Sequence, residues 1–542
     1  MWIPIQDIGR YGIITDIPPH QLPIGAWSSG HNVRFRNGRI FKSRGYEEVY
    51  TTATGTPYWG INTLVGGNSY WVYSSLSKLY SLVGASHAEI TRLDSSDVAE
   101  DYTVSRSSLW NGGVFNGILV VTNGTDVPQS WVPGTDTKAA NLANWPSTLT
   151  CKVLVPFRYF LVALNLQTSG GTRDAHRIRW SDSATPGTLP SSWAIDDATI
   201  DAGEFELPDF TSGPIVDAVP LREWLLIYTR DSVWAMRYIG GQNIFGFTRT
   251  FSSIGALENG CVSAFSHKGG QYHCVFTGDD VLIHDGSSVI ERLEGRLSQH
   301  IVRELSDTTW ERSYVINFPG VTENWICYPT GDSTYPNRAL IWNYNDNTTT
   351  FLNLKGVNWT SLGIVDDAVD RSAWDTQSGS WDDDSGSWDA PALQRHNLRP
   401  LGFSPASNMT GIFQLDTGSE IDGSVTEEFL ERTDLAIIPN RTNQADTTHE
   451  ADFDPVSWKL LRGIRFYLTG GPITVRLGAA QEIGGPIVYG ASSGHLNGPS
   501  SNRFDEHISG RSFAIQISAD TSTAWELHGM ELDIERTGGG NE

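Results

Sequence analysis

Residues 226–234, Leu-Ile-Tyr-Thr-Arg-Asp-Ser-Val-Trp, and residues 274–283, Cys-Val-Phe-Thr-Gly-Asp-Asp-Val-Leu-Ile, follow one pattern. Each begins with an apolar stretch, passes through a short polar turn and returns to an apolar stretch, which predicts two neighbouring β-strands. The two copies are about 48 residues apart. The same unit occurs at 70–80 and at 119–131, and Ser74 of the first copy lies about 48 residues before the equivalent threonine of the second.

Two weaker copies, at 159–180 and 339–347, extend this series from about residue 55 to about residue 355. A repeat of this length with several short strands is typical of the blades of a β-propeller, which pack around a common axis because one blade cannot bury both of its faces. The sequence therefore predicts a β-propeller-like domain of five or six blades over 51–360. An irregular array of β-sandwiches whose hairpins are similar by chance is the alternative.

The C-terminal part of the chain alternates apolar and polar residues at 464–468, 473–477 and 513–517. Such alternation gives each strand one buried and one solvated face, as in an antiparallel sandwich. We expect an all-β chain with an antiparallel β-sandwich domain over 425–537 and a disordered tail at 538–542. Residues 361–424 are expected to be an inserted loop region, and the clearest helix pattern is at 297–305, with apolar residues four apart.

The N-terminal 50 residues are predicted to form an extended segment, 1–50, that includes a hairpin around Asn37-Gly38. This hairpin is locally basic in an acidic protein. Its basic residues are Arg34, Arg36, Arg39, Lys42 and Arg44. The cluster is interpreted either as a solvated hairpin face or as a docking surface for an acidic partner or a phosphate.

Residues 374–389 contain a short repeat in which Trp-Asp recurs every seven residues. The three pairs are Trp374 with Asp375, Trp381 with Asp382, and Trp388 with Asp389. Serine, glycine and a run of aspartates disfavour regular buried structure, so an exposed loop is expected here. The aspartates do not follow the EF-hand spacing, so we expect no metal ion there.

Charge and composition exclude several classes of protein. The 542 residues include 62 acidic and 38 basic side chains, for a net charge of −24. A general nucleic-acid binder or a basic membrane-surface protein needs the opposite balance. No window is apolar enough for a transmembrane segment, and the first ten residues lack the pattern of a secretory signal peptide. The 4 cysteines form no CxxC pair, so they are expected to be small core residues of a chain folded in a reducing cytoplasm.

No pattern in the sequence makes a convincing case for catalysis. The stretch 490–494 matches G-x-S-x-G, but Asn-Gly-Pro follows it and cannot open the helix that a nucleophile elbow requires. His176 and His284 stand beside aspartates, as many turn residues do. Acid pairs such as 366–367 and 427–428 arise by chance among so many carboxylates. We therefore expect no catalytic residues, no cofactor and no metal.

Three stretches together resemble the tail nozzle (tail tubular) proteins of short-tailed bacteriophages. The first is 12–46, with Leu-Pro-Ile-Gly-Ala-Trp at 22–27 and Gly-Tyr at 45–46. The second is 233–256, which opens with Val-Trp-Ala-Met-Arg-Tyr-Ile-Gly-Gly, and the third is 276–289, which opens with Phe-Thr-Gly-Asp-Asp-Val.

The resemblance implies a homohexameric ring at the distal end of a phage tail, below an adaptor that joins it to the portal. It implies a propeller with accessory β domains, tip loops that close the channel before infection, and contacts with tail fibres and a tail needle or tip. Double-stranded DNA would pass through the lumen without stable binding, and the acidic charge would repel it. The family has no catalytic residues.

On this resemblance, the basic hairpin becomes a candidate contact with the adaptor or a neighbouring chain. The Trp-Asp loop becomes a candidate tip or gate. The expected location is the tail of the virion, after synthesis in the bacterial cytoplasm. The alternatives are a glycan- or receptor-binding propeller of the tail, whose exposed aromatic rings would stack on sugars, and a polysaccharide-degrading tail enzyme.

Overall fold

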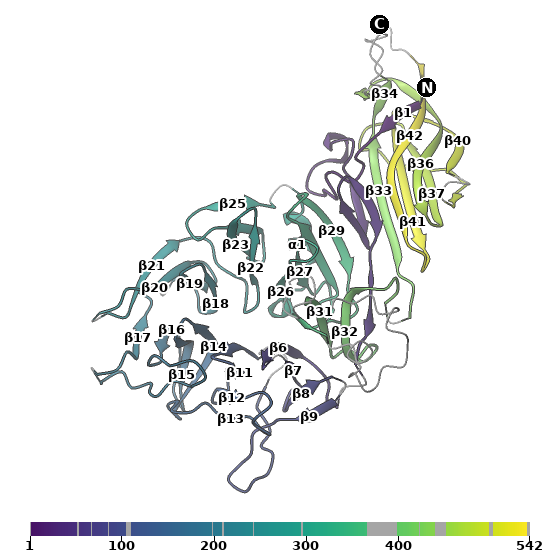
Figure 1. Cartoon of the computed structure of the whole chain (residues 1–542). Coiled ribbons are helices and arrows are strands. Elements are labelled where there is room, and N and C mark those ends of the chain that lie inside the picture. Colours follow the sequence, from purple (N-terminus) through teal and green to yellow (C-terminus); the bar gives the residue numbers. More distant parts are fainter. Residues whose placement is uncertain are drawn as a thin grey trace.

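The computed structural model of the chain is nearly all β-structure, with one propeller and one sandwich (Figure 1). It describes residues 2–50, 54–66, 68–84, 86–104, 110–197, 199–208, 211–241, 243–293, 296–365, 398–421, 423–439, 451–497 and 502–538.

Seven four-stranded antiparallel sheets form the propeller within these residues. Blades 1 to 3 are β6 (Trp59–Val65), β7 (Asn68–Ser74), β8 (Leu79–Val83) and β9 (Ser86–Glu89); β10 (Asn111–Phe115), β11 (Ile118–Thr122), β12 (Gln129–Trp131) and β13 (Ala140–Asn141); and β14 (Leu149–Phe157), β15 (Phe160–Thr168), β16 (Arg173–Trp180) and β17 (Gly203–Glu206). Blades 4 and 5 are β18 (Ile215–Leu221), β19 (Trp224–Thr229), β20 (Val233–Tyr238) and β21 (Phe245–Phe251); and β22 (Val262–His267), β23 (Gly270–Phe276), β24 (Val281–His284) and β25 (Val289–Arg292). Blades 6 and 7 are β26 (Tyr314–Phe318), β27 (Glu323–Tyr328), β28 (Arg338–Asn343) and β29 (Thr348–Asn353); and β30 (Trp359–Ile364), β31 (Leu398–Ser404), β32 (Gly411–Thr417) and β5 (Gly45–Glu48).

The ring closes where blade 7 packs on blade 1. Strand β30 contacts β6, and the carbonyl oxygen of Ile364 accepts hydrogen bonds from Trp71 Nε1 at 2.8 Å and Ser69 Oγ at 2.9 Å. The second strand of a blade is buried almost throughout, as in β11 and β27, because neighbouring blades cover both of its faces. This continuous burial explains the short apolar runs of the sequence repeat.

The blade count differs from the five or six predicted. The missing unit is blade 7, whose strands β30 to β32 lie mostly beyond residue 360, in the segment 361–424 that was expected to be an inserted loop. Its outer strand β5 comes from the N-terminal segment and pairs with β32. A blade built from two distant parts of the chain has no contiguous repeat in the sequence.

Two six-stranded sheets form the sandwich. One contains β1 (Trp2–Ile5), β3 (Val33–Arg36), β4 (Arg39–Lys42), β36 (Trp458–Gly470), β40 (Arg503–Gly510) and β42 (Trp525–Gly538). The other contains β2 (Ser29–His31), β33 (Glu427–Leu435), β37 (Ile473–Ala480), β38 (Val488–Tyr489), β39 (Gly494–Leu496) and β41 (Ser512–Asp520). Strands β34 (Ile437–Pro439) and β35 (Ala451–Phe453) form a separate hairpin beside them.

The N-terminal segment therefore belongs to both domains, which moves the boundary expected at residue 50. Strands β1 to β4 complete the sandwich, and β5 completes the propeller. The remaining elements are helix α1 (Ser298–Glu304), at the position of the predicted helix pattern, and two 3-10 helices, η1 (Pro19–Gln21) and η2 (Trp310–Arg312).

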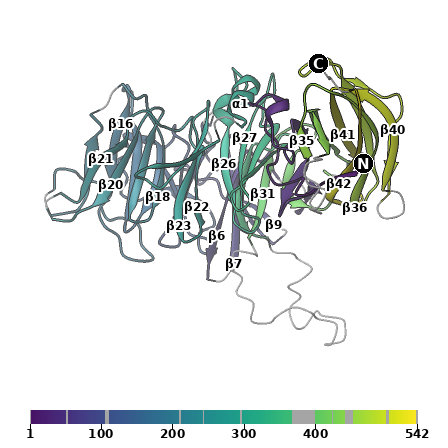
Figure 2. The ribbon, with the colours of Figure 1, turned by 90° about the horizontal axis from the view of Figure 1, so that it is seen from above.

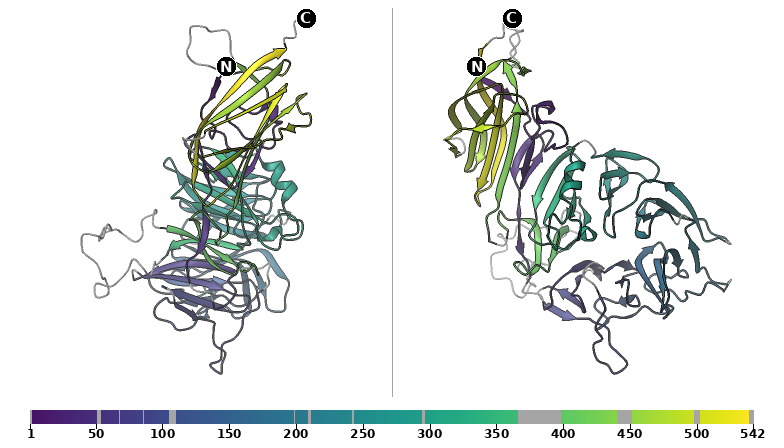
Figure 3. Two further views of the ribbon diagram at one scale, coloured as in Figure 1. Left: turned by 90° about the vertical axis from the view of Figure 1, so that its right-hand side faces the viewer. Right: turned by 180° about the vertical axis from the view of Figure 1, so that it is seen from behind.

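The sandwich packs against the outer edge of blade 6, and strand β1 lies near its far tip (Figures 1 and 2). Ile13 N–H donates to the carbonyl of Thr349 at 2.9 Å, and Thr349 Oγ1 donates back to the carbonyl of Ile13 at 2.7 Å. Asn32 N–H donates to the carbonyl of Phe351 at 2.8 Å. The N-terminal segment thus covers the edge of β29, and one apolar core continues from blades 4 to 6 into the sandwich. We call this contact region the joint; Figure 3 shows it from two further sides.

Candidate functional site

The predicted basic hairpin forms the charged centre of the joint. Arg34 is 3% exposed and its Nη1 pairs with Oε2 of Glu323, which is 1% exposed and lies at the start of β27. Arg36 pairs with the other oxygen of the same carboxylate at 2.9 Å. Trp325 Nε1 donates to Glu323 at 3.0 Å, and the Arg34 guanidinium lies over the Trp325 ring at 4.7 Å.

These contacts determine the charge state of Glu323. Burial alone would raise the pKa of this carboxyl, but the charges of Arg34 and Arg36 and the hydrogen bonds from Arg36 and Trp325 lower it below its ordinary value. Glu323 is therefore ionised and neutralises the buried charge of Arg34. Because Arg34 lies on β3 of the sandwich and Glu323 on β27 of blade 6, this ion pair connects the two domains.

The docking-surface interpretation is wrong for two of the five basic residues. Arg34 is buried against Glu323, and Lys42 is buried in an ion pair with Glu428 of β33, so neither side chain reaches a partner. Arg39 is half exposed and pairs with Glu526 at 2.8 Å, and Arg44 is exposed. For Arg36, which pairs with Glu323 but is one-third exposed, and for Arg39 and Arg44, contact with a partner stays a prediction.

The second predicted site lies outside the described residues. This holds for Trp374, Asp375, Trp381, Asp382, Trp388 and Asp389, and for the acid pair 366–367. The segment that contains them joins β30 to β31.

A cavity of about 380 Å³ lies on the axis of the propeller. Its lining comes from the innermost strands β6, β10, β14, β18, β22 and β30 and includes Trp59, Val155, Pro156, Asp217 and Trp359. A volume of this size is in the range of pockets that hold small molecules. The axis of one propeller therefore offers space for a small molecule or water.

Asp217 lines this cavity and has a strongly shifted pKa. It is 7% exposed and accepts backbone hydrogen bonds from Gly260 at 3.0 Å and Ala218 at 2.8 Å. Burial raises its pKa to about 7 despite these bonds, and the nearby charge of Glu258 adds to the rise. Glu258 itself pairs with Lys152 at 2.5 Å. The pairing leaves Lys152 unable to neutralise Asp217 fully.

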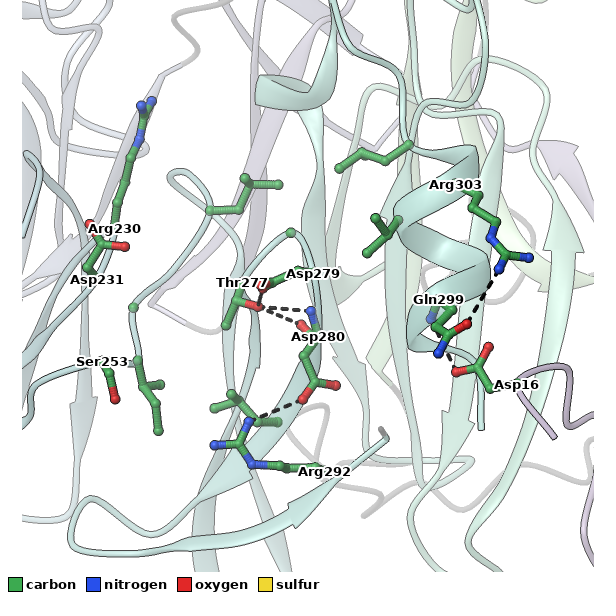
Figure 4. Close-up of a pocket in the computed structure, with 17 residues that line it drawn as sticks. Asp16, Arg230, Asp231, Ser253, Thr277, Asp279, Asp280, Arg292, Gln299 and Arg303 are labelled. Atoms are coloured by element: carbon green, nitrogen blue, oxygen red, sulfur yellow. Dashed lines mark hydrogen bonds and ion pairs between the residues drawn. The ribbon is translucent and has the colours of Figure 1, made fainter. Parts of the chain in front are cut away.

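A groove of about 840 Å³ opens beside helix α1, between blades 4 and 5 (Figure 4). Arg292 pairs with Asp280 at 3.3 Å, Arg303 donates to Gln299 at 3.4 Å, and the backbone of Gln299 donates to Asp16 at 3.2 Å. Arg292 and Asp280 thus form an ion pair within the groove, and Asp279 accepts a hydrogen bond from the Thr277 hydroxyl at 2.5 Å. Four aspartates and three arginines of the described residues line the groove, so it has no large excess of one charge that would select a ligand.

A fully buried chain of hydrogen bonds joins two histidines through Tyr228. Tyr228 Oη lies 2.6 Å from His273 Nδ1 and 2.9 Å from His284 Nε2. The backbone N–H of Gly286 donates to His284 Nδ1 at 3.1 Å, and His273 Nε2 lies 3.1 Å from the carbonyl of Pro220. This network assigns both rings as neutral, with His284 Nε2–H donating to Tyr228 and the Tyr228 hydroxyl donating to His273. Burial lowers the pKa of His273 to about 3 and that of His284 to about 4.

None of the sequence motifs for catalysis assembles into a site within the described residues. The stretch 490–494 joins β38 to β39, which both pair with β37, so no helix follows its serines. His176 Nε2 lies 2.8 Å from the carbonyl of Gly213. Glu428 is buried against Lys42, whereas Glu427 points to solvent. Across the described part of the chain, no three His, Cys, Asp or Glu side chains converge on a possible metal position.

The four cysteines are all buried and unpaired, as expected for core residues. No helix in the described ranges has the length and apolar character needed to cross a membrane.

Sequence reasoning missed Glu323, Asp217 and the Tyr228 chain. Glu323 gave no signal because its partner Arg34 is 289 residues away in the sequence. Asp217 could have been noticed, since it is an acid inside the apolar run 215–221. Tyr228 lies in one copy of the repeat and His284 directly follows the next copy, but the repeat alone does not place them in contact.

Comparison with known proteins gives no family. No protein-family model matches the chain, and no curated protein sequence matches it. Among solved structures, the WD40 β-propeller domain of Doa1 is 8% identical with a TM-score of 0.37, over 69% of this chain and 96% of that chain. PorZ, an essential surface component of the type-IX secretion system of Porphyromonas gingivalis, is 10% identical with a TM-score of 0.33, over 72% of this chain and 43% of that chain. At these scores the likeness carries no functional argument, and the propeller assignment rests on the strand pairing of the chain itself.

Proposed function

We propose that this chain is a structural, non-enzymatic subunit of a bacteriophage tail. Several copies would form a distal ring, of six by the resemblance, that conducts the genome during ejection and closes the channel beforehand. The ring would contact a portal adaptor and tail fibres, as the nozzle proteins that the chain resembles do.

The observation that carries the proposal is the position of the residues behind the resemblance. The stretch 12–46 forms the joint between the two domains. Gly12 has a φ of +69° and lies where a Cβ atom would come within 2.5 Å of the Thr349 carbonyl oxygen. Trp27 Nε1 donates to the carbonyl of Ile8 at 2.8 Å, and Tyr46 Oη accepts from the backbone of Lys355 at 2.7 Å. The residues behind the resemblance thus lie at positions that fix the arrangement of the two domains.

The dimensions of the propeller constrain how such a subunit would work. Because the innermost strands of one propeller surround a cavity of only about 380 Å³, DNA would pass between subunits and not through a propeller. A rigid joint suits this role, since the wall of a conduit must keep its shape as the genome moves past. The net charge of −24 per chain would keep DNA from binding to that wall.

Single-particle imaging of the purified chain, alone and mixed with its adaptor, tests the proposal. We expect rings with an axial lumen wider than a duplex and with the propeller axes outside that lumen. A monodisperse monomer under both conditions would overturn the proposal. Specific binding of that monomer to host polysaccharide, measured by calorimetry, would then favour a glycan-binding tail protein.

A further inference from the structure

An exposed aromatic and aliphatic patch lies on the turns of blades 3 and 4. Tyr159, in the turn between β14 and β15, is 61% exposed. Tyr238, the last residue of β20, and Ile239, in the turn that follows, are 45% and 59% exposed. We call these three residues, with Arg158, the rim. Large apolar side chains grouped in this way on a surface often mark a contact with another protein.

The rim is supported from below by packed rings. The ring of Tyr238 lies 6.2 Å from that of Phe160 and 5.9 Å from that of Phe245, and both phenylalanines are buried. The Arg158 guanidinium lies over the Tyr238 ring at 5.5 Å. A surface held in place by its own core loses little conformational freedom when a partner binds.

Two arginines stand at or beside the rim of this strongly acidic protein. Arg158 pairs with Glu223, which is 83% exposed. Arg237 precedes Tyr238 but lies on the opposite face of β20, over the Trp224 ring at 3.9 Å, without an acidic partner in the described residues. Tyrosine and arginine are the residue types enriched at the energetic centres of protein interfaces. The partner that fits this surface is apolar with negative charge.

The sandwich carries a surface of that kind. Phe453 of β35, Val456 and Trp458 are 57%, 68% and 38% exposed, and Asp452 and Asp454 stand among them. Asp454 is held ionised by hydrogen bonds from the Ser457 hydroxyl and from the backbone of Val456 and Ser457. We call residues 452–458 the corner.

The rim and the corner lie at opposite ends of the molecule. Strands β20 and β21 are on the side of the propeller away from the sandwich, and β34, the partner of β35, is at the tip of the sandwich (Figures 1 and 2). Two different complementary patches at opposite ends produce a head-to-tail contact, which closes into a ring or continues as a filament.

We propose that the rim of one chain docks on the corner of a second copy of the same chain. This inference rests on the proposed ring and names the surfaces that build it.

Two variants and a mixing experiment test the contact. The rim variant is Tyr159→Ser with Ile239→Asp, and the corner variant is Phe453→Ser with Val456→Asp. The control is Val488→Asp, at a residue that is 72% exposed on β38, outside both patches. All five sites are exposed, so folding is expected to survive, and circular dichroism and thermal melting check this.

Sedimentation velocity of the full chain should show wild type and control assembling, and each variant as a monomer. We expect at least a tenfold rise in the dissociation constant for the contact. An equimolar mixture of the two variants should form dimers and nothing larger, because each dimer joins the one intact rim to the one intact corner.

The outcomes separate this inference from the function on which it rests. Assembly of the rim or corner variant like wild type would overturn the rim–corner contact and leave the ring untouched. Failure of the mixture to form dimers, when both variants are folded, would also overturn it. A wild-type chain that stays monomeric alone and with its adaptor would overturn both the contact and the proposed ring.

Discussion

Replacement of Glu323 by glutamine should destabilise the chain by about 3–5 kcal/mol. The substitution keeps the shape of the side chain and removes its charge. Arg34 then remains 3% exposed with no anion in contact except Asp416 Oδ1, 3.4 Å from its other nitrogen. A buried guanidinium that loses its main counter-ion costs far more than a surface pair, since water cannot take the place of the carboxylate.

A double-mutant cycle separates the pair from general damage. In Arg34→Met with Glu323→Gln, both charges are removed, so the loss should be smaller than for Glu323→Gln alone. The coupling energy should therefore be about 2 kcal/mol or more. Arg36→Met is the matched control, because this arginine also contacts Glu323 but is 34% exposed, and its pair should contribute no more than about 1 kcal/mol.

Urea unfolding followed by tryptophan fluorescence measures these differences, with limited proteolysis of the native protein as a second readout. Loosening of the joint should expose the N-terminal segment, so Glu323→Gln should be cleaved within 12–46 faster than wild type. A cost below about 1 kcal/mol for Glu323→Gln, or equal costs for the single and double variants, would refute the assignment of this pair as the centre of the joint.

Three further changes probe the buried polar groups and the backbone. On acidification from pH 7.5 to 5, Asp217→Asn should lose about 2–3 kcal/mol more stability than wild type. Native Asp217, with a pKa of about 7, takes up a proton in this pH range, whereas the unfolded chain does not, so its protonation stabilises the wild-type fold as the pH falls. The two buried histidines act in the opposite direction, because their pKa values of about 3 and about 4 keep them neutral in the fold while they gain protons in the unfolded chain. Equal pH slopes for the variant and wild type in urea titrations would contradict this prediction. Tyr228→Phe should cost about 2–4 kcal/mol in the same assay, because it leaves one imidazole acceptor and one imidazole donor buried without partners, and an unchanged midpoint would argue against the network. Gly12→Ala should lower the melting temperature more than Gly117→Ala, because both glycines have positive φ but a Cβ atom at the first meets the Thr349 backbone and at the second meets nothing; similar shifts would show that backbone strain alone matters.

The fold class could be predicted because blades are local. Each of blades 1 to 6 uses four consecutive strands, and its second strand is a short apolar run that recurs at a near-constant spacing. The all-β class and the sandwich at the C-terminus are confirmed for the same reason, since alternation along a strand is a local property. Blade 7 was missed because β5 and β32 are neighbours in space but lie in distant parts of the sequence.

The candidate site was less predictable because its chemistry is made of long-range pairs. Arg34, Arg39 and Lys42 belong to the same basic hairpin in the sequence. Arg34 and Lys42 are nevertheless buried, whereas Arg39 is half exposed. Their acids lie 289 and 386 residues away, at Glu323 and Glu428. A basic run in a sequence does not show whether an acid comes from the same chain or from a partner.

The same reasoning explains where the scarce cations of this chain are found. With 62 acids against 38 bases, a buried basic group can find a carboxylate within the chain, as Arg34 and Lys42 do. Arg432 and Lys459 are buried against backbone carbonyls instead. The exposed basic groups that remain without an internal acid are therefore more informative than those that cluster in the sequence. Arg237 is such a group: it is exposed and lies over the Trp224 ring, on the opposite face of β20 from the rim residue Tyr238. The rim is therefore a better candidate for contact with another acidic chain than the basic hairpin 34–44. No sequence pattern predicts the rim, whereas the hairpin is the clearest basic cluster in the sequence.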